Sequence, residues 1–235
     1  MRPLRLESPA ALPTRIASRL AEHEGLFRQH EFLESVLKSD AVRNLVAELR
    51  DYLRQQRIHG YHCTKEPVPG FFASRGLRLT DVRAHQEEFL DTFGERFTES
   101  ELKRIRAAWD GYFVRGGQVR DRNGCIWTCL SRSLVKTSGT ETFFRFFGGE
   151  AIFMPLRHDA PVASKLQAIG QPVVVEVSLP GDGLTARYSM ELAVLSQYHR
   201  TIRPDAYPYE AEAQMNQAVP AKDVICVTPL HEFQP

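Results

Sequence analysis

Apolar residues recur at spacings of three and four along the first quarter of the chain. Between positions 31 and 57 they are Leu33, Val36, Leu37, Val42, Leu45, Val46, Leu49 and Leu53. This period is typical of amphipathic helices. It predicts one helix over 14–29, opened by Thr14, and one or two helices over 31–57, with a break where Ser39 or Asp40 caps the second piece. We therefore expect residues 1–57 to form an N-terminal helical segment packed on the following domain.

From Ile58 the period changes to two. Positions 58–64 alternate as a short strand, which puts Ile58, Gly60, His62 and Thr64 on one face. Prolines at 67 and 69 end this strand, and a helical turn over Phe71–Arg75 that ends at Gly76 follows. Two further helices are predicted over 82–113, with Thr80 or Asp81 and then Thr98 or Ser100 as their caps.

Short runs rich in aromatic and β-branched residues dominate after position 115. They predict strands over Cys125–Leu130, Thr142–Phe147, Glu150–Met154, Val173–Ser178 and Val224–Thr228. An amphipathic helix is predicted over Ser189–Tyr198, while Tyr207–Gln217 stays open between loop and helix. Helices followed by strands favour an α+β fold. We expect residues 58–235 to form one α+β domain with a helical insertion at about 82–113.

Composition narrows the class of protein. The chain has 235 residues, 43% of them hydrophobic and 25% charged, with a formal net charge of +1, so no global field indicates nucleic acid or a membrane as partner. The cysteines are Cys63, Cys125, Cys129 and Cys226; they form no CxxC pair, which favours reduced thiols and no metal site. No window offers the roughly 20 apolar residues of a membrane span, and the N-terminus lacks a signal-peptide core, so we expect a cytoplasmic protein.

One carboxylate interrupts the most aromatic stretch of the chain, Phe143–Leu156. Glu150 follows directly on Gly148 and Gly149. A carboxylate in an apolar run is costly unless it is hydrogen-bonded, paired or facing a wet cleft, and paired glycines allow the backbone to bulge or to admit a ligand closely. The simpler interpretation is an edge strand with Glu150 in solvent.

Several segments, in chain order, resemble motifs of the ADP-ribosyltransferase superfamily. They are Gly60–Thr64 (His-x-Thr), Phe72–Leu77 (a short helix ending in Gly-Leu), Cys125–Ser131 (the middle motif strand), Phe146–Glu150 (a strand ending on a catalytic Glu) and Val219–Val227 (a closing Pro-x-x-Asp strand). The resemblance covers roughly 58–230 and implies the split antiparallel β-sheet core of that superfamily. The dinucleotide and P-loop signatures GxGxxG and GxxxxGK[ST] do not occur.

The resemblance implies NAD as substrate and no metal. Glu150 would be the catalytic residue, because a fixed carboxylate stabilises the oxocarbenium-like transition state of nicotinamide–ribose cleavage. His62 would position the NAD ribose, with Thr64 in support. Gly60 would leave room for the ligand, and Gly148 and Gly149 would allow its close approach to Glu150.

The middle motif departs from the usual pattern. Trp127, Thr128 and Ser131 are all candidates for the residue that contacts nicotinamide, and Tyr61 or Phe71 could supply the stacking ring instead. Arg75 could bind the pyrophosphate through its planar guanidinium, or simply be a solvated surface residue, and His62 could equally be a core histidine.

These features predict an NAD-dependent ADP-ribosyltransferase that modifies a macromolecular acceptor (protein, RNA or DNA) and acts as a toxin or phage-conflict effector. Its partners would then include a cognate antitoxin or immunity protein but no membrane, and it could be delivered into a target cytoplasm. The alternatives are an NAD glycohydrolase or an RNA 2′-phosphotransferase on the same fold, and a non-catalytic α+β binding or adaptor module. Acceptor choice lies in loops that the sequence does not place.

Overall fold

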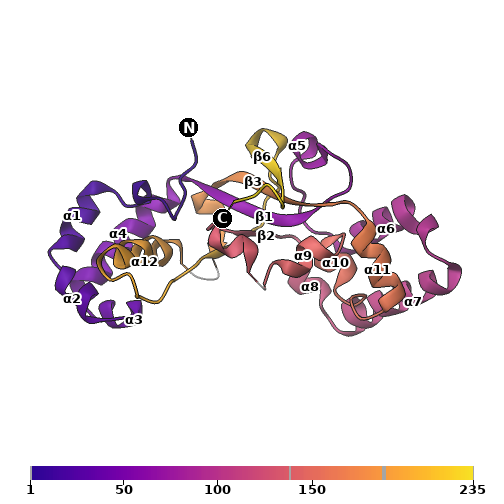
Figure 1. Ribbon diagram of the computed structural model, residues 1–235, viewed down its shortest axis with the longest axis horizontal. Helices are drawn as coiled ribbons and strands as arrows, with labels where there is room; N and C mark the ends of the chain where they lie inside the picture. The colour runs from indigo at the N-terminus through magenta and orange to yellow at the C-terminus, as the bar shows by residue number, and fades with distance from the viewer. Residues whose placement is uncertain (1, 138, 187–188, 235) are drawn as a thin grey trace. The chain divides into compact units, whose positions relative to one another are not determined.

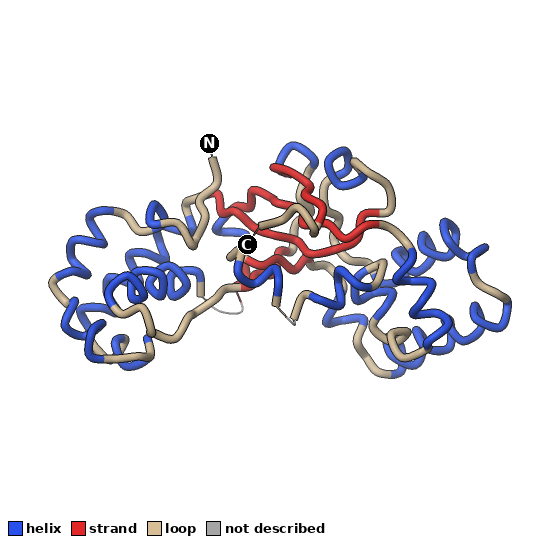
Figure 2. The backbone as a smooth tube through the Cα atoms, viewed as in Figure 1, coloured by secondary structure: helices blue, strands red, loops and turns tan. Residues whose placement is uncertain are grey.

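The computed structural model describes residues 2–137, 139–186 and 189–234, and it has an α+β fold (Figure 1). The strands form a six-stranded sheet in the order β4-β5-β2-β1-β3-β6, drawn in red in Figure 2. Their bounds are β1 Arg57–Glu66, β2 Ile126–Cys129, β3 Gln171–Pro180, β4 Leu184–Ala186, β5 Glu212–Met215 and β6 Val224–Pro229. β1 pairs antiparallel with β2, with Tyr61 opposite Cys129. The α+β class is confirmed.

The chain divides into two compact units, each assembled from separate segments. The first contains 1–61, 127–134 and 177–214, and the second contains 62–126, 135–176 and 215–235. The boundary between them falls within β1, β2, β3 and β5. The sequence predicts a division between residues 57 and 58, whereas the first unit combines segments from both sides of that position. The outer ends of the predicted domains, Met1 and Pro235, lie outside the described residues.

The first unit contains the N-terminal helices, but the single helix predicted over 14–29 is divided into two, and Pro13 rather than Thr14 precedes the first. They are α1 Thr14–Ala21, α2 Glu24–Gln29, α3 Leu33–Val36 and α4 Asp40–Arg54, and they are joined by α12 Met190–Ile202. α4 packs on α1 and α12 through its fully buried leucine stripe, of which Leu49 and Leu53 are members. The side chain of His199 on α12 is also fully buried, and its Nε2 lies 2.9 Å from the carbonyl oxygens of Phe27 and His30, to which it donates. This contact ties α12 to α2.

The second unit has a helical core built from segments far apart in the sequence. The helices of this unit are α5 Phe71–Arg75, α6 Val82–Phe93, η2 Gly94–Arg96, α7 Glu99–Trp109, the π-helix η3 Asp110–Arg115, α8 Val119–Arg122, α9 Glu141–Arg145, α10 Gly149–Phe153, α11 Ala160–Ala168 and η6 Ala221–Asp223. The short helix η4 Ser133–Lys136 spans the boundary between the two units. Asp81 caps α6 through the Ala84 N–H (3.0 Å), and Thr98 forms a capping box with Glu101 on α7, as predicted. Buried aromatic side chains of α6, α7 and α10, among them Phe89, Trp109 and Phe153, share one cluster.

Two predicted strands in the aromatic stretch are wrong. Thr142–Phe147 and Glu150–Met154 form the short helices α9 and α10 instead. Gly148 (φ 92°) and Gly149 (φ 63°) adopt left-handed backbone conformations that start α10. The aromatic side chains enter the helical core, and Phe146 stacks on Phe153 with ring centroids 5.5 Å apart. Packing against α6 and α7 therefore overrides the strand propensity of this run.

Candidate functional site

His62 and Thr64 are the accessible side chains of an otherwise buried stretch of strand. Tyr61, Cys63 and Lys65 on β1 are 0%, 8% and 4% exposed, whereas His62 and Thr64 between them are half-buried. Residues two apart in a strand share a face. The strand predicted here is confirmed, and it presents a histidine and a threonine side by side within the second unit.

The C-terminal end of β1 is anchored inside the second unit by two buried charged side chains. The Nζ of Lys65 donates to the Gln167 carbonyl near the end of α11, and burial lowers the pKa of this ammonium group. The Oε1 of Glu66 accepts the Phe72 N–H at 3.1 Å. Glu66 therefore fastens the start of α5 to the strand that carries His62.

The other end of α5 is fastened through Gly76. Gly76 (φ 73°, ψ −158°) caps the helix, and its N–H donates to the Phe72 carbonyl. The next residue, Leu77, exchanges two 2.8 Å backbone hydrogen bonds with Val219. A Cβ at Gly76 would lie 2.0 Å from the Val219 oxygen, so only glycine permits this approach. The predicted turn ending at Gly76 is confirmed.

α5 presents an aromatic ring and a guanidinium together. The Arg75 Cζ lies 4.8 Å from the centroid of the Phe71 ring, which is half-buried and packs edge-on against Phe72. Arg75 itself is exposed. Since both ends of α5 are fastened, these groups hold a fixed position on their own unit.

The space expected at Gly60 for a ligand is already filled. A Cβ at this position would meet the Leu179 side chain at 2.6 Å and the Val177 side chain at 3.4 Å. The absence of a side chain at Gly60 therefore lets Val177 and Leu179 of β3 pack against β1. The expectation that this glycine makes room for NAD is wrong.

Glu150 lies in the first turn of helix α10. Its Oε2 is 2.6 Å from the Arg122 Nε, and the two side chains are 24% and 23% exposed. A Cβ at Gly148 would overlap Ile152, so the paired glycines are explained by the start of the helix. The expectation that Glu150 is fixed on a strand is wrong, although it is held in place by an ion pair.

Tyr61, Trp127 and Ser131 belong to the first unit, as do Gly60 and Thr128. The other predicted site residues belong to the second unit. The fully buried Tyr61 donates its hydroxyl to Glu7 Oε1 at 2.9 Å and stacks on His59, with ring centroids 4.8 Å apart. Ser131 is buried, with its hydroxyl 3.1 Å from that of Ser133.

Of the two other candidates for the middle motif, Trp127 is 39% exposed, while the Thr128 hydroxyl donates to the Ala213 carbonyl at 3.4 Å and is buried. Trp127 is therefore the accessible candidate on β2.

The sequence did not predict Glu212 as a strand residue or as part of a site. Glu212 is half-buried on β5, the neighbour of β2, where the Leu130 N–H donates to the Ala211 carbonyl at 2.9 Å. The segment 210–217 has the composition of a helix because Glu, Ala, Gln and Met are good helix formers. Only the pairing with β2, which the sequence does not reveal, makes it a strand.

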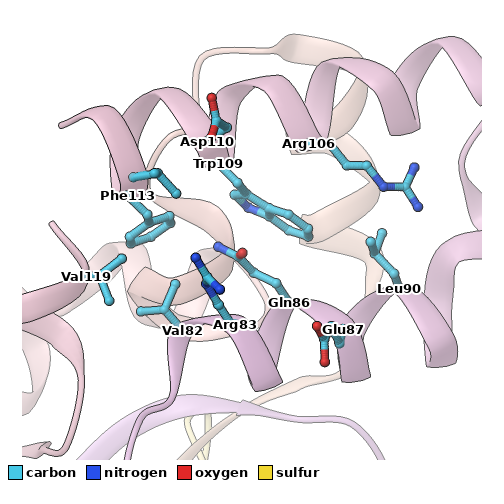
Figure 3. Close-up of a pocket in the computed structure, with 11 residues that line it drawn as sticks. Val82, Arg83, Gln86, Glu87, Leu90, Arg106, Trp109, Asp110, Phe113 and Val119 are labelled. Atoms are coloured by element: carbon cyan, nitrogen blue, oxygen red, sulfur yellow. The ribbon is translucent and has the colours of Figure 1, made fainter. Parts of the chain in front are cut away.

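A separate groove of about 230 Å³ lies between α6 and α7 with η3 (Figure 3). Trp109 and Phe113 line it, and Arg83 and Gln86 extend toward Trp109. Its described lining includes none of the predicted site residues. Within residues 2–137, 139–186 and 189–234, no group of three or more His, Cys, Asp or Glu side chains is arranged to hold a metal, and no helix is long and apolar enough to cross a membrane.

Comparison of the chain with models of protein families, with curated proteins and with solved structures finds no match in any of the three. The function of the chain is therefore inferred from its own residues and their geometry.

Proposed function

We propose that this chain is an NAD-dependent ADP-ribosyltransferase that binds NAD along β1 and α5 of its second unit. The observation that carries the proposal is the half-buried pair His62 and Thr64 on a buried strand, with a short helix fastened directly after it. In the superfamily that these segments resemble, the matching histidine hydrogen-bonds a ribose hydroxyl of NAD.

α5 supplies groups suited to the rest of a dinucleotide. The Phe71 ring offers a stacking surface for a base, and the Arg75 guanidinium offers a planar fork of donors for the pyrophosphate. The Arg75–Phe71 contact of 4.8 Å keeps the guanidinium over the ring. Because Glu66 and Val219 fasten the two ends of α5, little conformational entropy is lost when such a ligand binds.

In the proposed reaction the bond between nicotinamide nitrogen and ribose C1′ breaks, and nicotinamide leaves with the bonding electron pair. A nucleophile of the acceptor then bonds to C1′ and loses its proton. The positive charge that develops on the ribose requires a nearby ionised carboxylate. We assign this role to Glu150, which Arg122 holds in place at 2.6 Å.

Glu212 provides a matched comparison for Glu150, since both carboxylates are half-buried and only Glu212 lies on a strand. We expect wild-type protein to release nicotinamide from NAD, and Glu150→Gln to lower the rate by roughly 10²–10³-fold, as losing one electrostatic stabiliser does elsewhere, with an unchanged thermal melt. Glu212→Gln is expected to retain the wild-type rate.

Two other outcomes would contradict parts of the proposal. Loss of activity in Glu212→Gln alone would move the catalytic role to the strand carboxylate. No NAD turnover and no thermal shift of the wild type at millimolar NAD would reject the enzyme and favour a binding module. Radiolabelled ADP-ribose separates transfer to protein, RNA or DNA from simple hydrolysis of NAD, because hydrolysis leaves the label in a small molecule.

A further inference from the structure

β6 is an edge strand of the sheet whose exposed surface is apolar. It comes last in the strand order, and Val224–Thr228 contains no charged residue. Ile225 is 44% exposed, and Cys226, on the opposite face of the strand, is also exposed. Proteins usually protect such edges with charges, prolines or bulges, because the unpaired backbone groups accept another strand.

α5 packs against β6, and the proline and the bonded N–H groups that protect this edge lie at the two ends of the strand. Pro229 has no N–H, and the Asp223 N–H is already bonded to the Pro220 carbonyl at 2.9 Å. The Leu230 N–H donates to the Pro172 carbonyl of β3 at 2.9 Å. Because N–H groups alternate in direction along a strand, Ile225 and Val227 direct theirs away from β3. Among the described residues neither N–H bonds to a turn or loop backbone.

We propose that β6 pairs antiparallel with β6 of a second copy of this chain, which joins two sheets edge to edge across a twofold axis at Cys226. In this register Ile225 of each copy exchanges backbone hydrogen bonds with Val227 of the other, and Val224 lies opposite Thr228. Within Val224–Thr228 every facing pair is uncharged, and Asp223 lies opposite Pro229 just beyond this window. The Ile225–Val227 pairs are β-branched on both sides, a favourable cross-strand combination.

The neighbouring twofold registers are poorer. Centring the axis on Ile225 places the Asp223 carboxylate opposite Val227, and centring it on Val227 places Ile225 opposite Pro229, which has no N–H to donate. A strand of another protein would need a sequence complementary to Val224–Thr228, whereas a second copy of this chain presents the same strand by twofold symmetry. The proposal does not depend on NAD or on the proposed function.

The register makes a specific chemical prediction. Cys226 faces Cys226 of the second copy at a non-hydrogen-bonded position, where the Cα atoms lie about 4.5 Å apart. This separation is within the roughly 4.4–6.8 Å that a disulfide spans. The other cysteines, Cys63, Cys125 and Cys129, are buried. Copper–phenanthroline, which takes one electron from each thiol as it loses its proton, should therefore cross-link wild-type protein through Cys226, and Cys226→Ser should not be cross-linked.

Light scattering after size exclusion at micromolar concentration should give twice the 26.7 kDa chain mass for the wild type and for Cys226→Ser. Ile225→Lys and Val227→Glu should each raise the dissociation constant of the dimer roughly tenfold or more, because each buries a charge without a partner. Ile225→Val is the matched control and should stay dimeric.

Mixing the Ile225→Lys and Val227→Glu variants should restore the dimer as a heterodimer, since the register places the introduced lysine of one copy opposite the introduced glutamate of the other. A monomeric wild type would overturn the proposal. A dimer that is indifferent to Ile225→Lys, or that forms no Cys226 cross-link, would overturn it equally.

Discussion

Replacing Gly76 by alanine should destabilise the second unit strongly. Gly76 occupies a backbone region that is essentially restricted to glycine (φ 73°, ψ −158°), and forcing another residue into such a region costs about 1–3 kcal/mol. The added Cβ would also lie 2.0 Å from the Val219 oxygen. Relieving this overlap separates Leu77 from Val219 and removes two backbone hydrogen bonds, each worth roughly 0.5–1.5 kcal/mol.

Together these terms predict a loss of roughly 2–6 kcal/mol in the free energy of unfolding, which for a chain of this size lowers Tm by about 10 °C. Urea unfolding followed by circular dichroism measures the free energy, and calorimetry measures Tm. Gly94→Ala is the matched control, because Gly94 has an ordinary φ of −58° and no atom within 4 Å of an added Cβ.

The control should change stability by no more than about 1 kcal/mol. A Gly76→Ala protein within about 1 kcal/mol of wild type would refute the reasoning, since it would mean that α5 can part from Val219 at little cost. At temperatures where Gly76→Ala is folded, we also expect weaker NAD binding, because Phe71 and Arg75 lose their fixed position.

Two further predictions concern the helical core of the second unit. Trp109→Phe removes the 3.0 Å hydrogen bond from Nε1 to the Ile152 carbonyl, which should lower the free energy of unfolding by about 1–3 kcal/mol. The fluorescence maximum should also shift to longer wavelength, because the remaining tryptophan, Trp127, is 39% exposed. An unchanged emission maximum would contradict the burial of Trp109. Hydrogen bonding by Lys165 lowers the pKa of the Glu101 carboxyl, so its stabilising contribution is present above the unfolded pKa of about 4.3 and is lost as pH falls through the lower folded value. The stability difference between wild type and Glu101→Gln should therefore shrink as the pH of urea unfolding is lowered through this range, and a constant difference would exclude the ion pair as its cause.

The sequence predicts correctly those features of the fold that depend only on neighbouring residues. The β1 strand, the α5 turn ending at Gly76, and the caps Asp81 and Thr98 all form as predicted. Each depends on alternation, on glycine at a positive φ, or on a side chain that accepts an N–H within the next turn. Neighbouring residues determine these features, so the sequence reveals them.

The errors arose where distant packing decides the structure. Phe143–Leu156 is short and apolar, and such a run cannot be assigned to strand or helix from its period; contacts with α6 and α7 make it helical. The reverse happened at β5, where good helix formers pair with β2 as a strand. The same dependence on distant packing affects the candidate site. His62 lies on the predicted strand, whereas Glu150 lies on a helix because its segment packs in the helical core.

The most direct test of the central claim is a calorimetric titration of NAD into wild-type protein, His62→Ala and His231→Ala. His231 is a matched control, since its side chain is 80% exposed and close to the C-terminus. We predict saturable binding by the wild type, at least roughly tenfold weaker binding by His62→Ala, and wild-type affinity in His231→Ala. Equal affinities of the wild type and His62→Ala, or no binding heat at millimolar NAD, would contradict an NAD site on β1 and α5.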